Sequence, residues 1–255
     1  METPTIPTPT ESPPPAETSL ANRLTNVYAA PGEVFDEVKA SPVKTGNWLV
    51  PILISCVAVI AYIAVVFSQE AIIRGMRETQ EKAIQKQVDA GKIPQAQADT
   101  IIQGMEKFMT PTLMALFGGF GGVMTIFTMT FAVACVLWLA STFIFKTPVP
   151  YLKMVEFTGL TMMVDALEKI VRALLAIWKG SMLATLGPIL LVENPSMSNK
   201  THLYLSMLDV IDVWWLSLLA LALSKAAGVS FWKTAPLIFV VWFGCRALLI
   251  FFTPG

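Results

Sequence analysis

Two acidic residues, Asp209 and Asp212, interrupt one of the most apolar stretches of this chain. The stretch reads YLSMLDVIDVWWLSLLALALSK, residues 204–225, and is long enough to cross a membrane. A charge at the centre of a bilayer costs about 2.5–3.5 kcal/mol, so such acids need a counter-charge, an interfacial position or a function. They are three residues apart, which places them on one face of a helix.

The preceding apolar segment, residues 154–178, carries charges of both signs. Its acids precede its bases by four residues, from 165 to 169 and from 168 to 172, which is the spacing of helical ion pairs. We predict one charge cluster at the membrane boundary with a role in assembly. Its members are Asp165, Glu168, Lys169, Arg172, Asp209 and Asp212. Two alternatives stay open, an acid pair that only caps and pins its own helix, and an ion or proton site.

Acids on different membrane segments, such as Asp165 and Asp209, are also found in intramembrane aspartyl proteases. That chemistry needs YD and GxGD sequences, and neither occurs here. G-x-S-x-G, H-E-x-x-H and phosphate-loop motifs do not occur either. The three cysteines lie in apolar stretches without a C-x-x-C pair, and His202 is the only histidine. We therefore expect no enzymatic activity, no cofactor and no metal site.

The composition is that of a membrane protein. Of 255 residues, 55% are hydrophobic and only 14% are charged, against about 25% charged in soluble domains. The 18 basic and 18 acidic residues give a formal net charge of zero. This balance leaves no basic surface for nucleic acid.

Five segments have the length of a membrane-spanning helix, about 20 residues for a hydrocarbon core of about 30 Å. We place them at about 48–68, 122–145, 154–178, 205–224 and 235–252. The uncharged stretch 111–145 is too long for one crossing, so we expect a break at GGFGG, residues 118–122, after an interfacial piece. Gly118 and Gly122 also form a GxxxG motif, which can allow close helix packing. The predicted fold is all-α, a polytopic membrane protein with a bundle of five transmembrane helices in residues 48–255 and an extramembrane helical hairpin.

Three segments fall outside the spans. Residues 1–21 are proline-rich and are expected to be disordered. Residues 22–47 form an amphipathic juxtamembrane segment, with Val34, Phe35 and Val38 at helical spacing. This segment is either a helix on the membrane surface or a simple linker helix.

Residues 69–110 are different in kind, with six basic and six acidic residues. Gly91 and Pro94 interrupt the helical pattern, so we predict a helix, a turn and a second helix projecting from the membrane. A solvated hairpin with no activity is the simplest interpretation.

Five spans would put the ends of the bundle on opposite sides of the membrane. Seven basic residues fall on the N-terminal side and eight on the other, but six of those eight lie in the long loop 69–110. Long loops contribute little to orientation, so the count favours a cytoplasmic N-terminus. Arg246, near the end of the last span, is expected to snorkel to the headgroups.

Three short motifs resemble the Yip-domain family, the Ypt/Rab-interacting-protein-like polytopic membrane proteins. They are the Pro-x-x-x-Phe and W-x-x-P elements of VYAAPGEVFDEVKASPVKTGNWLVPILI, the segment LGPILL, and LDVIDVWWLSLLALALS. The last resembles L-D-x-F-x-x-W-x-x-x-L-x-x-x-G, with Ile211 in place of the phenylalanine and Ala222 in place of the glycine. The matching positions are Pro31, Phe35, Trp48, Pro51, Gly187, Pro188, Asp209 and Trp214. The resemblance covers roughly residues 26–252.

This resemblance implies five spans with a cytoplasmic N-terminus. Eukaryotic members are linked to prenylated Rab GTPases and often carry a D-L-Y-G-P segment, which this sequence lacks. The similarity is closer to the bacterial branch, and binding of a Rab-type GTPase is not supported.

The implied function is that of a non-enzymatic protein of the bacterial inner membrane. It would act in membrane organisation, in a trafficking-like role, or as a partner-binding scaffold. Its partners would be the lipid bilayer, other membrane proteins or a second copy. The alternative is a small transporter or proton- or ion-coupled permease that uses the charged residues of the third and fourth spans. The sequence shows no repeated half-topology, which often marks such proteins.

Overall fold

The computed structural model describes residues 18–253. Most of the segment expected to be disordered, residues 1–21, therefore lies outside the described residues. Its last two residues belong to helix α1, Leu20–Ala29, so the predicted disordered segment extends two residues too far. Ser19 explains the start of α1, because its side-chain oxygen accepts a hydrogen bond from the backbone N–H of Asn22.

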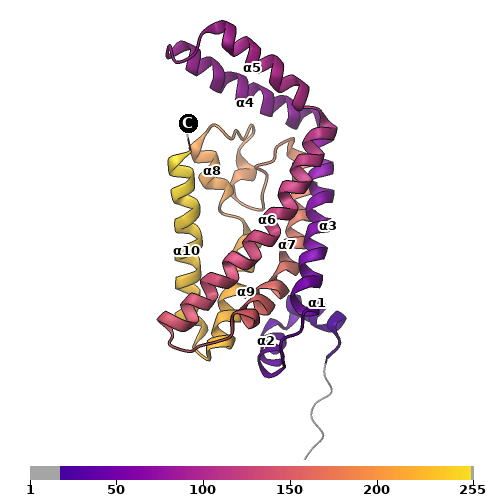
Figure 1. Ribbon diagram of the computed structural model, residues 1–255, viewed down its shortest axis with the longest axis vertical. Helices are drawn as coiled ribbons and strands as arrows, with labels where there is room; N and C mark the ends of the chain where they lie inside the picture. Colours follow the sequence, from indigo (N-terminus) through magenta and orange to yellow (C-terminus); the bar gives the residue numbers. More distant parts are fainter. Residues whose placement is uncertain (1–17, 254–255) are drawn as a thin grey trace, which may run out of the picture.

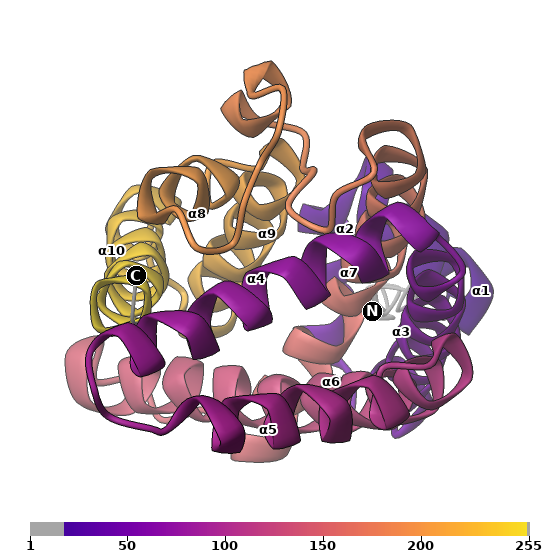
Figure 2. The same cartoon turned by 90° about the horizontal axis from the view of Figure 1, so that it is seen from above.

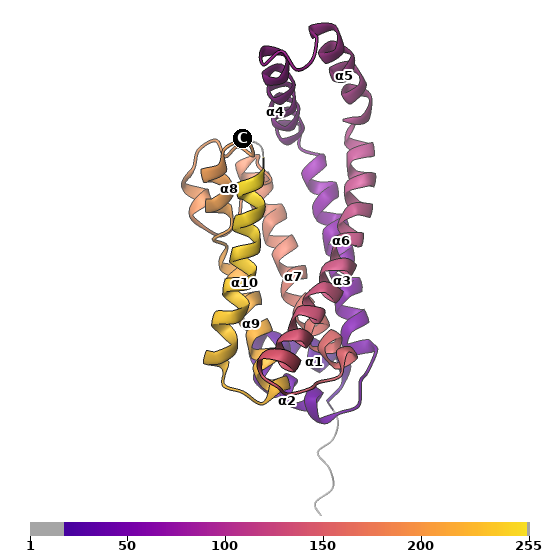
Figure 3. The same ribbon diagram turned by 60° about the vertical axis from the view of Figure 1, so that its left-hand side comes forward.

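Residues 18–253 form ten α-helices and no strand, which confirms the all-α class (Figure 1). Five long helices make the body of the molecule and alternate in direction along the chain (Figures 1 and 3). They are α3 (Gly46–Phe67), α6 (Pro111–Leu139, extended by a π-helical turn to Ile144), α7 (Tyr151–Lys179), α9 (Val210–Ala227) and α10 (Phe231–Phe252). Within the described residues, four helices are long and apolar enough to cross a membrane, and α7 is not among them because of its charges.

The connecting helices lie at the two ends of this body. Helices α1 and α2 (Pro31–Ala40) cover the lower end in Figure 1, and α8 (Lys200–Ser206) lies near the upper end. Helices α4 (Glu70–Asp89) and α5 (Gln95–Phe108) form the expected hairpin above the upper end. Gly91 allows the turn because its φ is +67°. Seen from above, α4 crosses over the bundle from the side of α3 towards that of α10 (Figure 2).

Helix α6 corrects the expected break at residues 118–122. It runs without interruption through GGFGG, so the second long helix begins at Pro111 and not at 122. The glycines do not reverse the chain, and instead allow side chains of α3 to pack closely against α6. A Cβ on Gly122 would lie 2.9 Å from Val59 Cγ2, and one on Gly118 would lie 2.9 Å from Phe67 Cε2. The GxxxG motif thus allows α6 to approach α3 closely.

The segment predicted to be amphipathic contains α1 and α2, whose apolar faces pack on the bundle. The apolar face of α2, made by Val34, Phe35 and Val38, is buried in the main hydrophobic core with residues of α7 and α9. Phe35 packs edge-on against Phe157, with ring centroids 5.6 Å apart. This segment therefore closes the end of the bundle.

Helix α7 lies at the centre of the packing, and its contact with α3 is the most extensive between any two described helices. A Cβ on Gly159 would collide with the backbone of Trp48, so glycine is needed where the two helices cross. Ser55 Oγ donates to the Met162 carbonyl at 2.7 Å across the same interface. Such small residues and interhelical hydrogen bonds are typical of membrane helix contacts.

Helices α9 and α10 begin at residues that differ from the expected 205 and 235. Helix α8 ends at Ser206, and α9 starts only at Val210, after a short non-helical link. The link is held by a backbone hydrogen bond, in which Val210 N donates to the Leu186 carbonyl at 3.0 Å. Helix α10 begins four residues before 235, at Phe231. The acids Asp209 and Asp212 therefore lie at the very start of a helix.

Candidate functional site

The charged side chains of α7 follow one helical face, because 165, 168, 169 and 172 are separated by three or four residues. Lys169 Nζ lies 2.8 Å from Asp165 Oδ1 and 3.3 Å from Glu168 Oε2. Arg172 forms a second ion pair with Glu168 through Nε. Lys169 and Arg172 thus each have an acid of their own helix as a partner.

Arg172 also joins α7 to the start of α9. Its Nη2 lies 3.3 Å from Asp209 Oδ2 and 3.9 Å from Asp212 Oδ2. The other oxygen of Asp209 caps α9, accepting a hydrogen bond from the Ile211 N–H at 2.9 Å. Only 1% of Asp209 is exposed. Asp209 therefore has two roles, as the N-cap of α9 and as a counter-charge for α7.

Arg246 of α10, expected to snorkel to the headgroups, pairs with Asp212 and completes the cluster. Arg246 Nη1 donates to Asp212 Oδ2 at 2.5 Å, and the guanidinium lies 5.8 Å from the centre of the Trp242 ring. The structure thus brings together all six residues of the predicted cluster and adds a seventh. The seven residues come from three consecutive long helices, α7, α9 and α10. We refer to them below as the charge cluster.

The charge cluster is acid-rich. Four carboxylates and three basic groups give 3 − 4 = −1 in formal charge. Asp209, Asp212 and Glu168 are each at least nine-tenths buried, whereas Arg172 and Arg246 keep 20% and 29% of their side chains exposed. These three acids therefore lie inside, Asp165 is 19% exposed, and the two arginines face outwards. In the described residues, no group of three or more His, Cys, Asp or Glu side chains has the arrangement of a metal site.

A cavity of about 330 Å³ borders the charge cluster on the side of these arginines. Arg172 and Arg246 line it together with the hydroxyl-bearing Thr185 and Ser206. Apolar side chains of the 182–207 segment and of α10 make the rest of the wall.

A second polar network, which the sequence analysis missed, lies at the opposite end of α7. Lys153 Nζ donates to Glu156 Oε2 at 2.6 Å and to the carbonyls of Val38 and Ser41 at the end of α2. Asn47 Nδ2 donates to Glu156 Oε1 at 2.6 Å. Because Glu156 is fully buried, these partners are needed to satisfy its charge. The i, i+3 spacing of Lys153 and Glu156 at the start of an apolar segment was the available signal.

The same network continues into the N-terminal helices through Arg23, of which only 2% is exposed. Arg23 Nη1 donates to Asn47 Oδ1 at 3.3 Å, and Arg23 Nη2 donates to Glu37 Oε1 at 2.7 Å. This hydrogen bonding from Arg23 lowers the pKa of the Glu37 carboxyl below its usual value. Polar bonds as well as apolar burial therefore attach α1 and α2 to the bundle.

The family-motif positions fall at the places where separate segments meet. Pro31 is the first residue of α2, where its missing N–H has no helical partner in any case, and Pro51 is buried within α3. Trp48 packs edge-on against Phe131, and Trp214 lies 5.9 Å from the Tyr28 ring.

Gly187 and Pro188 lie beside the start of α9. Asp209, another family-motif position, is the N-cap of that helix. A Cβ on Gly187 would collide with the Leu208 carbonyl, so only glycine fits where these two segments of the backbone meet. Pro188 opens a short 3₁₀ helix, Pro188–Leu191. The LGPILL segment therefore supports the link that positions the acids of α9.

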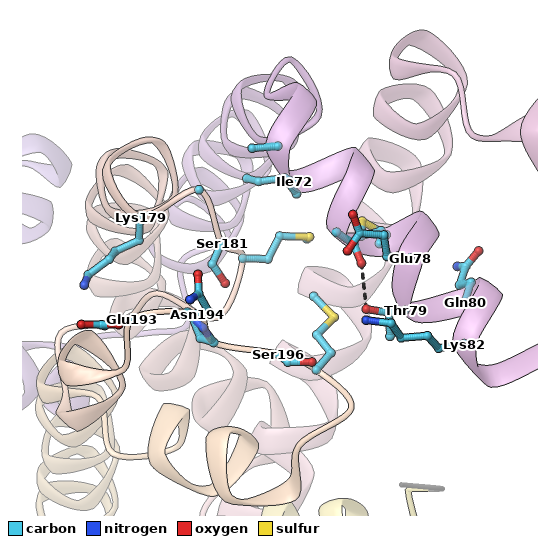
Figure 4. Close-up of a pocket in the computed structure, with 17 residues that line it drawn as sticks. Ile72, Glu78, Thr79, Gln80, Lys82, Lys179, Ser181, Glu193, Asn194 and Ser196 are labelled. Carbon is cyan, nitrogen blue, oxygen red and sulfur yellow. Dashed lines mark hydrogen bonds between the residues drawn. The ribbon is translucent and has the colours of Figure 1, made fainter. Parts of the chain in front are cut away.

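A further cavity, of about 460 Å³, separates the hairpin from the upper loop (Figure 4). Its lining includes Glu78 and Lys82 of α4, Lys179 at the end of α7, and Glu193 of the loop. Figure 4 shows these side chains around the opening, with Thr79 bonded back to α4 through the Gly75 carbonyl at 2.7 Å. Two acids and two bases leave this wall without a net charge that would select a ligand.

Comparison with known proteins gave one match. No curated protein and no solved structure matches the sequence. The family model of the Yip1 domain, however, matches residues 25–253, nearly the whole chain. That range contains the second half of α1, all of α2, the five long helices and every residue of the charge cluster. The chain is therefore a member of the Yip1-domain family of membrane proteins.

Proposed function

We propose that this protein is a non-enzymatic, five-span membrane scaffold whose α4–α5 hairpin binds a partner outside the membrane. In this proposal α7 is the fifth span, because its charges between 165 and 172 are paired within the protein and its 29 residues fall within the 18–34 residues of the candidate spans. The N-terminus is cytoplasmic and the membrane is the bacterial inner membrane.

The observation that carries this proposal is the small amount of burial in the hairpin. Only Ile72 and Ile73 of α4 and Ala98 of α5 are buried, all the other described side chains of these helices being at least partly exposed. Most of the stability of helices in proteins comes from tertiary packing and not from intrinsic helix propensity. The hairpin also exposes large apolar side chains, Ile101 and Phe108, together with charges of both signs. A protein partner that packs on this surface would supply the missing burial.

Local bonds keep the hairpin preformed. Gln85 and Gln95 each donate to an aspartate four residues later, at 2.9 Å, and Arg77 Nη2 donates to the Met109 carbonyl at 3.0 Å. A preformed surface loses less entropy on binding than a flexible loop. The comparisons give the transporter alternative no support.

Photocrosslinking in intact cells tests this proposal. A benzophenone amino acid at Gln85 or Ile101 on the hairpin should give an adduct of one defined mass. The same group at Met129, on the exposed face of α6, is the matched control and should give no such adduct. Differently tagged copies of the chain separate self-association from binding of another protein. If the hairpin positions react no more than Met129, the scaffold proposal is wrong.

A further inference from the structure

The charged side chains in the wall of the 330 Å³ cavity beside the charge cluster are all basic. Both outward-facing arginines, Arg172 and Arg246, line it, and none of the described residues that line it is acidic. The carboxylates that pair with these arginines lie behind them, in the interior of the bundle. A group in this cavity would therefore meet guanidinium N–H groups first.

The two guanidiniums have donors that the protein does not use. Among the described residues, Arg172 Nη1 and the Nε and Nη2 atoms of Arg246 form no hydrogen bond to the protein. A guanidinium presents five N–H donors in a rigid plane that matches the oxygens of a phosphate. Two such groups facing one cavity can bind the oxygens of a single phosphoryl group together.

The rest of the wall and its position indicate an amphiphile. Met182, Leu203, Leu249 and Ile250 line the cavity beside the arginines. Leu249 and Ile250 lie in the last turn of α10, a candidate membrane span that ends at Phe252. A cavity at the end of a span lies at the level of the lipid headgroups, where guanidinium groups can bind the phosphate of a headgroup.

The formal charge of the charge cluster indicates whether the bound phosphate is a free ion or part of a lipid headgroup. Because it is −1, the site has no net positive field to attract a free anion, and affinity must come from direct N–H contacts and from the apolar wall. Only a ligand with an acyl chain uses both. We propose that this cavity binds the phosphoryl headgroup of an anionic phospholipid, held by Arg172 and Arg246, with its chain against the apolar wall. This proposal is independent of partner binding by the hairpin.

Native mass spectrometry of the full chain, released from detergent micelles, tests the proposal with three probes. These are phosphatidylglycerol, zwitterionic phosphatidylcholine, and inorganic phosphate as a competitor. Arg246→Gln removes one guanidinium, and Leu203→Trp fills the cavity without changing a charge. Leu248→Trp is the matched control, because Leu248 is 60% exposed on α10 and does not line the cavity.

Wild-type protein and Leu248→Trp should bind phosphatidylglycerol equally and more tightly than phosphatidylcholine, with no displacement by phosphate. Each site variant should weaken phosphatidylglycerol binding about tenfold or more. If Arg246→Gln does not fold, the comparison of the two tryptophan variants decides the matter alone. Equal binding by Leu203→Trp and Leu248→Trp, equal affinity for the two lipids, or displacement by phosphate would each overturn the proposal.

Discussion

At the scale of single residues, the two acids at the start of α9 have different environments. Asp209 is bound on both oxygens, by the Ile211 N–H and by Arg172, whereas Asp212 is shared between Arg172 and Arg246. Loss of either arginine therefore leaves Asp212 with the other one. Loss of Arg172 leaves Asp209 without any basic partner among the described residues. Arg172 is the residue on which the charge cluster depends most.

The first prediction follows from this dependence. Arg172→Gln should lower the free energy of unfolding by about 3 kcal/mol, the low end for a broken buried pair, because Arg172 is partly exposed. Asp209→Asn removes the charge but can keep the cap, since asparagine is an equally good N-cap residue. The double variant should lose less than the sum of the two single losses. Steric trapping in bicelles measures these free energies.

Arg74→Gln is the control for that cycle, because Arg74 is exposed on the hairpin, and it should change stability by about 0.5 kcal/mol at most. Strictly additive losses in the Arg172 and Asp209 variants would show that the two residues are not coupled.

The second prediction concerns pH and the N-terminal helices. Because the pKa of Glu37 is lowered by Arg23, its carboxylate stabilises the folded state above the ordinary value of 4.5. This stabilisation is lost as the pH falls below 4.5 and through the folded-state pKa. Glu37→Gln should therefore lower the melting temperature at pH 7 and flatten its decline in acid.

Melting curves of both proteins in detergent between pH 7 and pH 3 provide the measurement. Glu33→Gln, at an exposed position on the same helix, should retain the wild-type decline. A Glu37→Gln curve parallel to that of the wild type would contradict the assignment.

At the scale of helices, close approach between α3 and α6 depends on two glycines. The third prediction is that Gly122→Ala is destabilising, by about 1–3 kcal/mol, because its Cβ would press on Val59, a side chain with little rotamer freedom. Gly121→Ala, one residue away, should be neutral or stabilising by up to about 1 kcal/mol, since no side chain lies within 4 Å of the added Cβ. Thermal denaturation in one detergent compares the pair. Equal melting temperatures would mean that α6 does not need the close contact.

Which helices form could be predicted from the sequence, and where some begin could not. Apolar length and the breakers Gly91 and Pro94 predicted the five long helices and the hairpin, because these signals are local. The break at GGFGG was wrong because glycine has two uses, chain reversal and close packing, and only the neighbouring α3 decides between them. The start of α9 was missed because it depends on Leu186, a residue distant in sequence.

In the candidate site, too, local spacing could be predicted and contacts between distant segments could not. Spacing within α7 and within the start of α9 was sufficient to group six charges. Arg246 was left out of the predicted cluster because its partner is 34 residues away and meets it only through the packing of α10 on α9. The Lys153 and Glu156 network was missed because its other members, in α1, α2 and the start of α3, are more than 100 residues away in sequence.

At the scale of the whole molecule, the alternating helices place α1 and α2 at one end of the bundle and the hairpin at the other (Figure 3). The fourth prediction is that these ends lie on opposite sides of the membrane. In a variant with its three cysteines replaced by alanine, Gln85→Cys should react with an impermeant maleimide added to intact cells. Val43→Cys, exposed near the other end, should react only after permeabilisation. The reverse pattern would show that the N-terminus is outside.

The sequence separation of the clustered charges has a consequence for biosynthesis. Arg172 leaves the ribosome 37 residues before Asp209, whereas Arg246 follows Asp212 by 34 residues, or about 2–7 s at ordinary rates of translation. When the acids of α9 reach the membrane, their first counter-ion is thus already present on α7, and the second arrives later with α10. Because Arg172 is synthesised first, both aspartates can pair with it as soon as the start of α9 packs against α7, before α10 is complete.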